Sequence, residues 1–126
     1  MNTILLDTHI FMWWVERPER LKDNIKTFIA DTDIIYISSI TSYEIYTKKA
    51  LGKLDISFDV QKTILKEGFY HLPYTHEHAE ILPLLPLLHR DPFDRMLITQ
   101  AMREKCPLVT ADKAIWAYNE IEIIKA

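Results

Sequence analysis

Glycine is scarce in this chain, and its scarcity excludes several classes of nucleotide-binding protein. Only two glycines, Gly52 and Gly68, occur among the 126 residues. The dinucleotide-binding fingerprint and the Walker sequence both need glycines closely spaced around a tight turn. Neither pattern is present, so any phosphate group must be bound by another kind of site.

Cysteine is nearly absent as well. Cys106 is the single cysteine, which excludes disulfides within the chain and favours a reducing compartment. Its neighbours Pro107 and Leu108 indicate a small buried hydrophobic residue rather than a catalytic thiol.

The chain also lacks a long uninterrupted apolar stretch. The first apolar run, Thr3–Leu6, is broken by Asp7, so it suits neither a signal peptide nor a membrane span. We therefore expect a cytoplasmic protein with no membrane partner. The net charge of −3 argues mildly against a simple binder of nucleic-acid backbones, which is usually basic on one face. It does not argue against a nuclease, because a metal site gathers carboxylates.

What is present is the composition of an ordinary globular protein, with 48% hydrophobic and 26% charged residues. The length suits one domain over residues 1–126. Strands are predicted at Thr3–Leu6, Ile34–Ile37, Phe69–Leu72, Pro107–Thr110 and Ile121–Ile124. Helices are predicted at His9–Val15, Glu19–Ala30, Phe58–Lys66, His76–Leu85, Pro92–Lys105 and Asp112–Tyr118. A further helix is predicted through Glu44 to about Leu51, with Ser38, Ser39 and Thr41 as candidates for its cap. This alternation predicts the α/β class: a three-layer α/β/α sandwich around a central, mainly parallel sheet.

Four acidic residues fall where such a sheet places its ligands. Asp7 directly follows the first strand, and Glu44 lies about one turn into the helix after the second. Asp94 is in the first turn of a later helix, and Asp112 follows the fourth strand. Ligands of open parallel sheets bind at the carboxyl ends of the strands, so residues distant in sequence can meet there.

Such a cluster favours a divalent cation. Carboxylates within a few ångströms of one another repel, and without a cation some of them would protonate. Their oxygen atoms are hard ligands of the kind that Mg²⁺ or Mn²⁺ prefers. The spacing therefore predicts a Mg²⁺ or Mn²⁺ site that could activate a water for phosphodiester hydrolysis.

Alternatives stay open at two positions. Asp94 and Asp112 could simply occupy helix N-termini, which favour negative charge. Asp91 precedes Asp94 by one helical turn and could share or replace its role, although its place before Pro92 suits a helix cap.

The segments around these acids resemble the motifs of PIN-domain proteins, particularly the toxin group related to VapC. In order, they are Ile4–His9 with Trp13 and Trp14, Ser42–Ile45 continuing to Leu54, Asp91–Ile98 with Gln100 and Ala101, and Leu108–Asp112. Together the four motifs span essentially the whole chain.

This resemblance implies a Mg²⁺- or Mn²⁺-dependent endoribonuclease whose catalytic and metal-binding acids are Asp7, Glu44, Asp94 and Asp112. Asp112 would be the outer member, and hydroxyl groups next to the motif acids, those of Thr8 and Thr110, would orient carboxylates or water. Members of the group are often toxins of type II toxin–antitoxin systems. The resemblance thus implies RNA as substrate, and an antitoxin protein and a second copy of the chain as partners.

Two other functions stay open. A phosphatase with an aspartyl intermediate is another Mg²⁺-dependent phosphohydrolase, but it needs a second Asp two residues after the first, where this chain has His9. A catalytically silent PIN-fold binding module would keep the fold and the four acids but would not cleave RNA.

The remaining charged residues carry weaker expectations. The five histidines are scattered. His76 and His78 are two residues apart, a poor helical spacing for joint metal ligation, so surface or capping roles are expected for them. Arg90 and Arg95 flank the third motif, where they could contact RNA phosphates.

Overall fold

The computed structural model describes residues 2–126, and its strands form one sheet. Their bounds are β1 Thr3–Leu6, β2 Ile34–Ser38, β3 Tyr70–Leu72, β4 Leu108–Thr110 and β5 Ile123–Lys125. The strand order is β3-β2-β1-β4-β5, and each pair of neighbours is parallel. The predicted mainly parallel sheet is confirmed, including the last strand at its edge.

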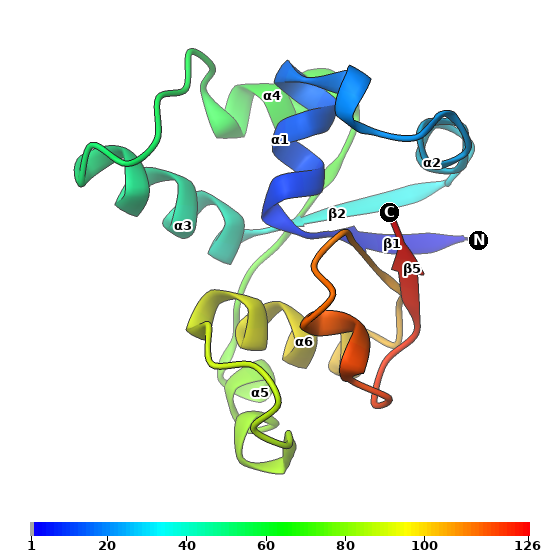
Figure 1. The fold of residues 1–126 in the computed structure, drawn as a ribbon, viewed down its shortest axis with the longest axis vertical. Coiled ribbons are helices and arrows are strands. Elements are labelled where there is room, and N and C mark those ends of the chain that lie inside the picture. Colours follow the sequence, from blue (N-terminus) through cyan, green and yellow to red (C-terminus); the bar gives the residue numbers. More distant parts are fainter. Residues whose placement is uncertain (1) are drawn as a thin grey trace.

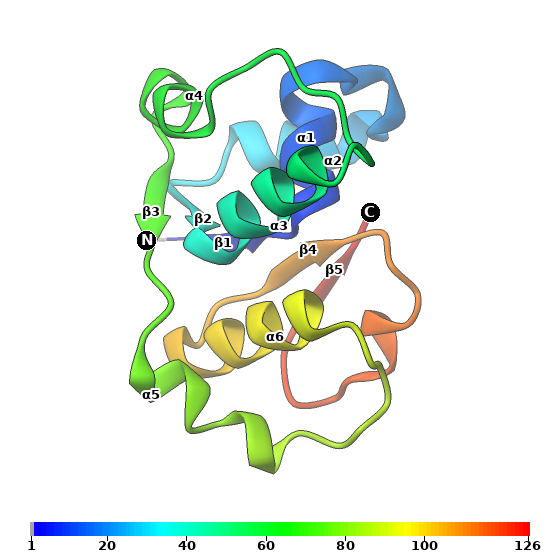
Figure 2. The ribbon, with the colours of Figure 1, turned by 90° about the vertical axis from the view of Figure 1, so that its left-hand side faces the viewer.

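Helices cover both faces of the sheet. They are α1 Thr8–Glu16, α2 Asp23–Ala30, α3 Ser39–Ala50, α4 Val60–Glu67, α5 His76–Ala79 and α6 Pro92–Glu104. In Figures 1 and 2, α1, α2 and α4 lie on one side of the sheet, whereas α5 and α6 lie on the other. This arrangement confirms the three-layer α/β/α sandwich.

Strand β1 shows why the sheet needs two covering layers. Its Ile4 and Leu6 side chains pack into the core beneath α1, α2 and α4. The intervening Leu5 packs into the second core, with Leu97 and Ile98 of α6. Successive side chains of a strand point to opposite faces, so a strand buried on both faces has a continuous apolar run rather than an alternating one.

The chain order creates a reversal point at β1. The chain moves outward from β1 to β2 and β3, then returns to place β4 on the other side of β1. Leu6 is paired with Val109, and the Asp7 N–H donates to the Val109 carbonyl at 3.1 Å. The carboxyl ends of β1 and β4 therefore lie side by side, at the place where open parallel sheets bind ligands.

Helix caps fix how the chain leaves this edge. The Ser38 hydroxyl accepts from the Ile40 N–H at the start of α3. The Asp91 carboxylate accepts from the Asp94 N–H at 3.1 Å and caps α6. Both caps were predicted, and both satisfy amide groups that a helix start leaves unpaired.

Two of the predicted helices are interrupted. The helix predicted over Glu19–Ala30 is a 3₁₀ turn, Pro18–Arg20, followed by α2, because Leu21 and Lys22 are extended between them. The helix predicted over His76–Leu85 ends at Ala79 and is followed by a 3₁₀ turn, Leu82–Leu84. Pro83 lies in that turn, and proline cannot donate the hydrogen bond that an α-helix requires.

A third predicted helix is much shorter than expected. The segment predicted as Asp112–Tyr118 keeps only a 3₁₀ turn, Ile115–Ala117. The Asp112 carboxylate accepts from the Ala114 N–H, a local bond that favours a turn over a helix.

Within residues 2–126, no helix combines the length and the apolar character that crossing a membrane requires.

Candidate metal centre

Asp7 is a buried acid at the carboxyl edge, with 4% of its surface exposed. Its carboxylate accepts from the Ile10 N–H at 2.9 Å, which caps α1, and from the Thr110 hydroxyl at the end of β4. Burial raises its pKa from 3.8 to about 6, against the opposing effect of these hydrogen bonds. The negative charges of Asp112 and Glu44 make smaller contributions to this rise.

Glu44 lies on α3 with 3% of its surface exposed. Its Oε2 atom accepts from the Lys48 ammonium, one helical turn later, at 2.6 Å. Its Oε1 atom is buried and has no hydrogen-bond partner among residues 2–126. A buried carboxylate oxygen without a partner is costly, so this atom marks a place where a ligand fits.

The third acidic group combines residues from three segments. The His89 Nε2 atom lies 2.7 Å from Asp94 Oδ2 and 3.4 Å from Asp112 Oδ2. The potential ligand atoms of these three residues lie within 4.8 Å of one another. Asp112 is the most exposed of them, with 42% of its side chain accessible.

The acids influence one another electrostatically. The pKa of Asp94 is raised from 3.8 to about 7, first by burial and then by the negative charge of Asp91. Glu44 and Asp7 raise it too, whereas the hydrogen bond with His89 lowers it. Asp94 and Asp7 thus share one electrostatic environment at the carboxyl edge, although they come from elements far apart in sequence.

These residues fit a divalent cation. Carboxylates held together in a buried site resist ionisation, and a cation among them would favour the ionised forms. The unpartnered Glu44 Oε1 offers a free oxygen, and the donor set of carboxylates with one imidazole matches what Mg²⁺ or Mn²⁺ accepts.

Sequence reasoning missed His89. No role in the site was predicted for it, yet it contacts two of the four acids. The His89 N–H donates to the Tyr118 hydroxyl at 3.0 Å, a contact between residues 29 positions apart. Its place two residues before Asp91 is the one sequence signal that could have pointed to it. By contrast, His78 has a predicted capping role, because its ring nitrogen accepts from the Thr75 N–H.

Arg95 has a role in the fold that was not predicted. Its guanidinium donates to the Pro86 carbonyl and to the Tyr118 hydroxyl, at 3.0 and 3.1 Å. It therefore supports the loop that carries His89, and a contact with RNA phosphates stays a prediction. The hydroxyl of Thr8 shares a hydrogen bond with that of Thr41 and not with a carboxylate.

Comparison with known proteins gives the class of protein. The family model described as the PIN domain matches residues 4–120, and the chain belongs to this family. The chain is 26% identical to Ribonuclease VapC22 of Mycobacterium tuberculosis over 122 residues, which cover 94% of each chain.

Solved structures share the fold at lower sequence identity. VapBC2 from Rickettsia felis, bound to a DNA fragment from its promoter, contains a chain with a TM-score of 0.73 and 17% identity, covering 98% of both chains. A toxin–antitoxin complex from Klebsiella pneumoniae contains one with a TM-score of 0.65 and 16% identity, covering 97% of this chain and 96% of that one. At these identities the likeness shows the fold alone.

Proposed function

We propose that this chain is a Mg²⁺- or Mn²⁺-dependent endoribonuclease and the toxin component of a type II toxin–antitoxin system. The observation that carries the proposal is the cluster of Asp94 and Asp112 with His89 at the reversal point of a PIN fold, with Glu44 and Asp7 close enough to raise the pKa of Asp94. The name of the relative Ribonuclease VapC22 supports the activity. The toxin–antitoxin complex with the same fold supports the biological role.

The four predicted acids, Asp7, Glu44, Asp94 and Asp112, would hold the ion, with His89 beside two of them. A bound divalent ion lowers the pKa of a water and stabilises the oxygens of the phosphodiester. The chain's own groups hold the acids ready: the Thr110 hydroxyl and the Ile10 N–H orient Asp7.

The single thiol of the chain is not available as an alternative nucleophile to water. Cys106 is buried, and burial followed by the charge of Glu104 raises its pKa to about 11. A thiol with this pKa is protonated at neutral pH and cannot serve as a nucleophile.

The test is cleavage of a broad RNA panel with Mg²⁺ or Mn²⁺ by wild type, Asp7→Asn and Asp55→Asn. Asn keeps the shape of Asp7 and its cap to α1 but removes the charge. Asp55 is an exposed acid in the loop after α3, so Asp55→Asn is a matched control. We expect cleavage by wild type and the control, and its loss in Asp7→Asn. Equal cleavage by all three would contradict the mechanism, and no cleavage by any would favour a silent binding module.

The proposal also names partners and a compartment. An antitoxin protein would inhibit the enzyme in the cytoplasm, where its RNA substrates are found. A second copy of the chain is proposed because aromatic side chains of α3 are exposed: Tyr43 is 64% and Tyr46 43% exposed. Sedimentation of wild type and Tyr43→Lys tests the dimer, which should weaken in the variant because a lysine disfavours an apolar interface.

A further inference from the structure

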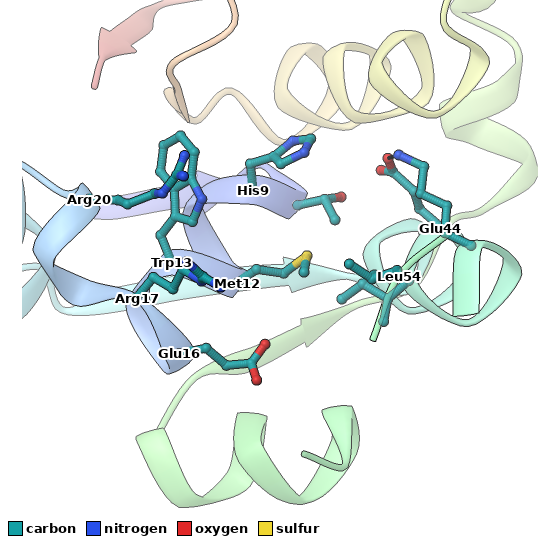
Figure 3. Close-up of a pocket in the computed structure, with 11 residues that line it drawn as sticks. His9, Met12, Trp13, Glu16, Arg17, Arg20, Glu44 and Leu54 are labelled. Carbon is teal, nitrogen blue, oxygen red and sulfur yellow. Dashed lines mark hydrogen bonds and ion pairs between the residues drawn. The ribbon is translucent and has the colours of Figure 1, made fainter. Parts of the chain in front are cut away.

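A pocket of about 260 Å³ lies beside the acidic edge, between α1 and the C-terminal part of α3. Glu44 lies at one end of the pocket, and Trp13 and Arg20 lie at the other (Figure 3). Lys48, which also lines the pocket, is paired with Glu44. The pocket therefore shares Glu44 with the metal centre. Its volume is just below the range of small-molecule sites, roughly 300–1,000 Å³.

The end of the pocket away from Glu44 offers a surface for stacking. The Arg20 guanidinium lies over the Trp13 ring, 5.8 Å from its centroid. The His9 ring lies 6.1 Å from the same indole. Nucleobases stack on aromatic rings and on guanidinium planes, and here the two kinds of surface adjoin.

The charge of the pocket differs from that of the whole chain. The chain has 18 acidic and 15 basic residues. The lining of the pocket includes the cations Arg17, Arg20 and Lys48 against the acids Glu16 and Glu44. This local reversal favours an anionic ligand, and it occurs beside the site proposed to cleave a phosphodiester.

We infer that this pocket binds one unpaired nucleobase of the RNA, next to the phosphodiester that is cleaved. The inference rests on the proposed ribonuclease function and specifies its substrate as a single-stranded or loop segment. A base in a duplex cannot enter, because its faces are covered by its stacked neighbours. Trp13 and Arg20 would stack on the base and Arg17 would contact the adjoining phosphate, while Met12 and Leu54 form the apolar walls.

The first test needs no cleavage. Metal-free wild type is titrated with the four ribonucleoside 5′-monophosphates while the indole N–H signals are followed by NMR. We expect at least one nucleotide to shift the Trp13 signal and leave that of Trp14 unchanged. Trp14 is on the same helix but packs against Phe69, 6.1 Å away, outside the pocket. A Trp13 signal that no nucleotide moves at millimolar concentration overturns the inference.

The second test combines protein and substrate changes. An RNA that wild type cleaves is prepared with a single abasic nucleotide at each position near the cut. One abasic position should lower cleavage by wild type about 5- to 100-fold, the usual loss when a stacked base is removed. In Trp13→Ala the intact RNA should already be cleaved more slowly, and the abasic change should have little further effect.

Arg20→Ala repeats this test with an exposed residue, so a folding defect of Trp13→Ala does not decide it. The control is Arg103→Ala, an exposed arginine of α6 with an ion pair to Glu77 on the surface. Equal sensitivity to the abasic position in wild type and both pocket variants overturns the inference. That result would assign the pocket to another kind of ligand, such as a protein partner, while wild-type cleavage would still support the ribonuclease.

Discussion

Replacing Asp7 with Asn should stabilise the metal-free protein while abolishing its activity. The pKa of Asp7 is about 6 in the native state against an ordinary value of 3.8. Each pKa unit corresponds to about 1.4 kcal/mol, so ionised Asp7 lowers the free energy of unfolding by about 3 kcal/mol. Asn carries no charge and can still accept from the Ile10 N–H at the start of α1.

The sign of the effect fixes its pH dependence. The native state holds the Asp7 proton more tightly than the unfolded chain, so stability falls as the pH rises from about 4 to about 6. Below this window Asp7 is protonated in both states and the substitution should have little effect. Above it, the metal-free variant should be more stable than wild type by about 3 kcal/mol.

Urea denaturation in a chelating buffer at pH 8 and at about pH 3.5 measures this difference. At pH 8 the urea midpoint for Asp7→Asn should rise by about 1–3 M, given a denaturant dependence of about 1–3 kcal/mol per M. Exposed Asp55→Asn should leave it unchanged. Adding Mg²⁺ should stabilise wild type more than the variant. A variant that is no more stable than wild type at pH 8, or equally stabilised at both pH values, would refute the reasoning.

Three further substitutions test the supports of the acidic edge. Thr110→Val removes the hydroxyl that donates to Asp7 and should lower the free energy of unfolding by about 1–3 kcal/mol at pH 8; an unchanged urea midpoint would contradict this role. His89→Gln should weaken Mn²⁺ binding about 10- to 100-fold, the range for residues that orient metal ligands, because His89 contacts Asp94 and Asp112. Titration calorimetry measures the Mn²⁺ affinity, and an undiminished affinity would exclude a role of His89 in orienting these ligands. Tyr118→Phe leaves the half-buried His89 N–H without its acceptor and should lower the free energy of unfolding by about 1–3 kcal/mol, measured as a lower melting temperature. An unchanged melting temperature would show that water replaces the hydroxyl.

The strands could be predicted closely because burial on both faces leaves a clear pattern. Thr3–Leu6 was predicted with the observed bounds, since Asp7 ends the apolar run abruptly. Helix ends were harder, because they depend on the conformation of one or two residues. The break at Leu21 has no Gly or Pro to mark it; there the chain turns so that Leu21, 4% exposed, can enter the core. Such a contact with distant residues leaves no local signal.

The places of the four candidate acids in the fold could also be predicted, because each lies just after a strand or in the first turns of a helix that the sequence marks. The residues that hold these acids in place could not be predicted. His89 lies in a loop without periodicity, and its position depends on Tyr118, whose own burial depends on the packing of the second core. The Lys48–Glu44 pair is different, since its spacing of four residues is the ordinary one for neighbours on a helix.

Buried negative charge is held in two ways at this edge: by the Glu44–Lys48 ion pair, and by Asp7 and Asp94, whose pKa values are raised. Glu44 has an internal cation at 2.6 Å, whereas burial and neighbouring acids make ionisation of Asp7 and Asp94 costly. In the metal-free protein these costs reduce stability near neutral pH, as worked out above for Asp7. A divalent ion bound among the acids would remove much of that cost, so its binding energy would be coupled to folding. Stability near neutral pH should therefore depend on the ion most strongly through Asp7 and Asp94, which form no ion pair with a lysine among residues 2–126.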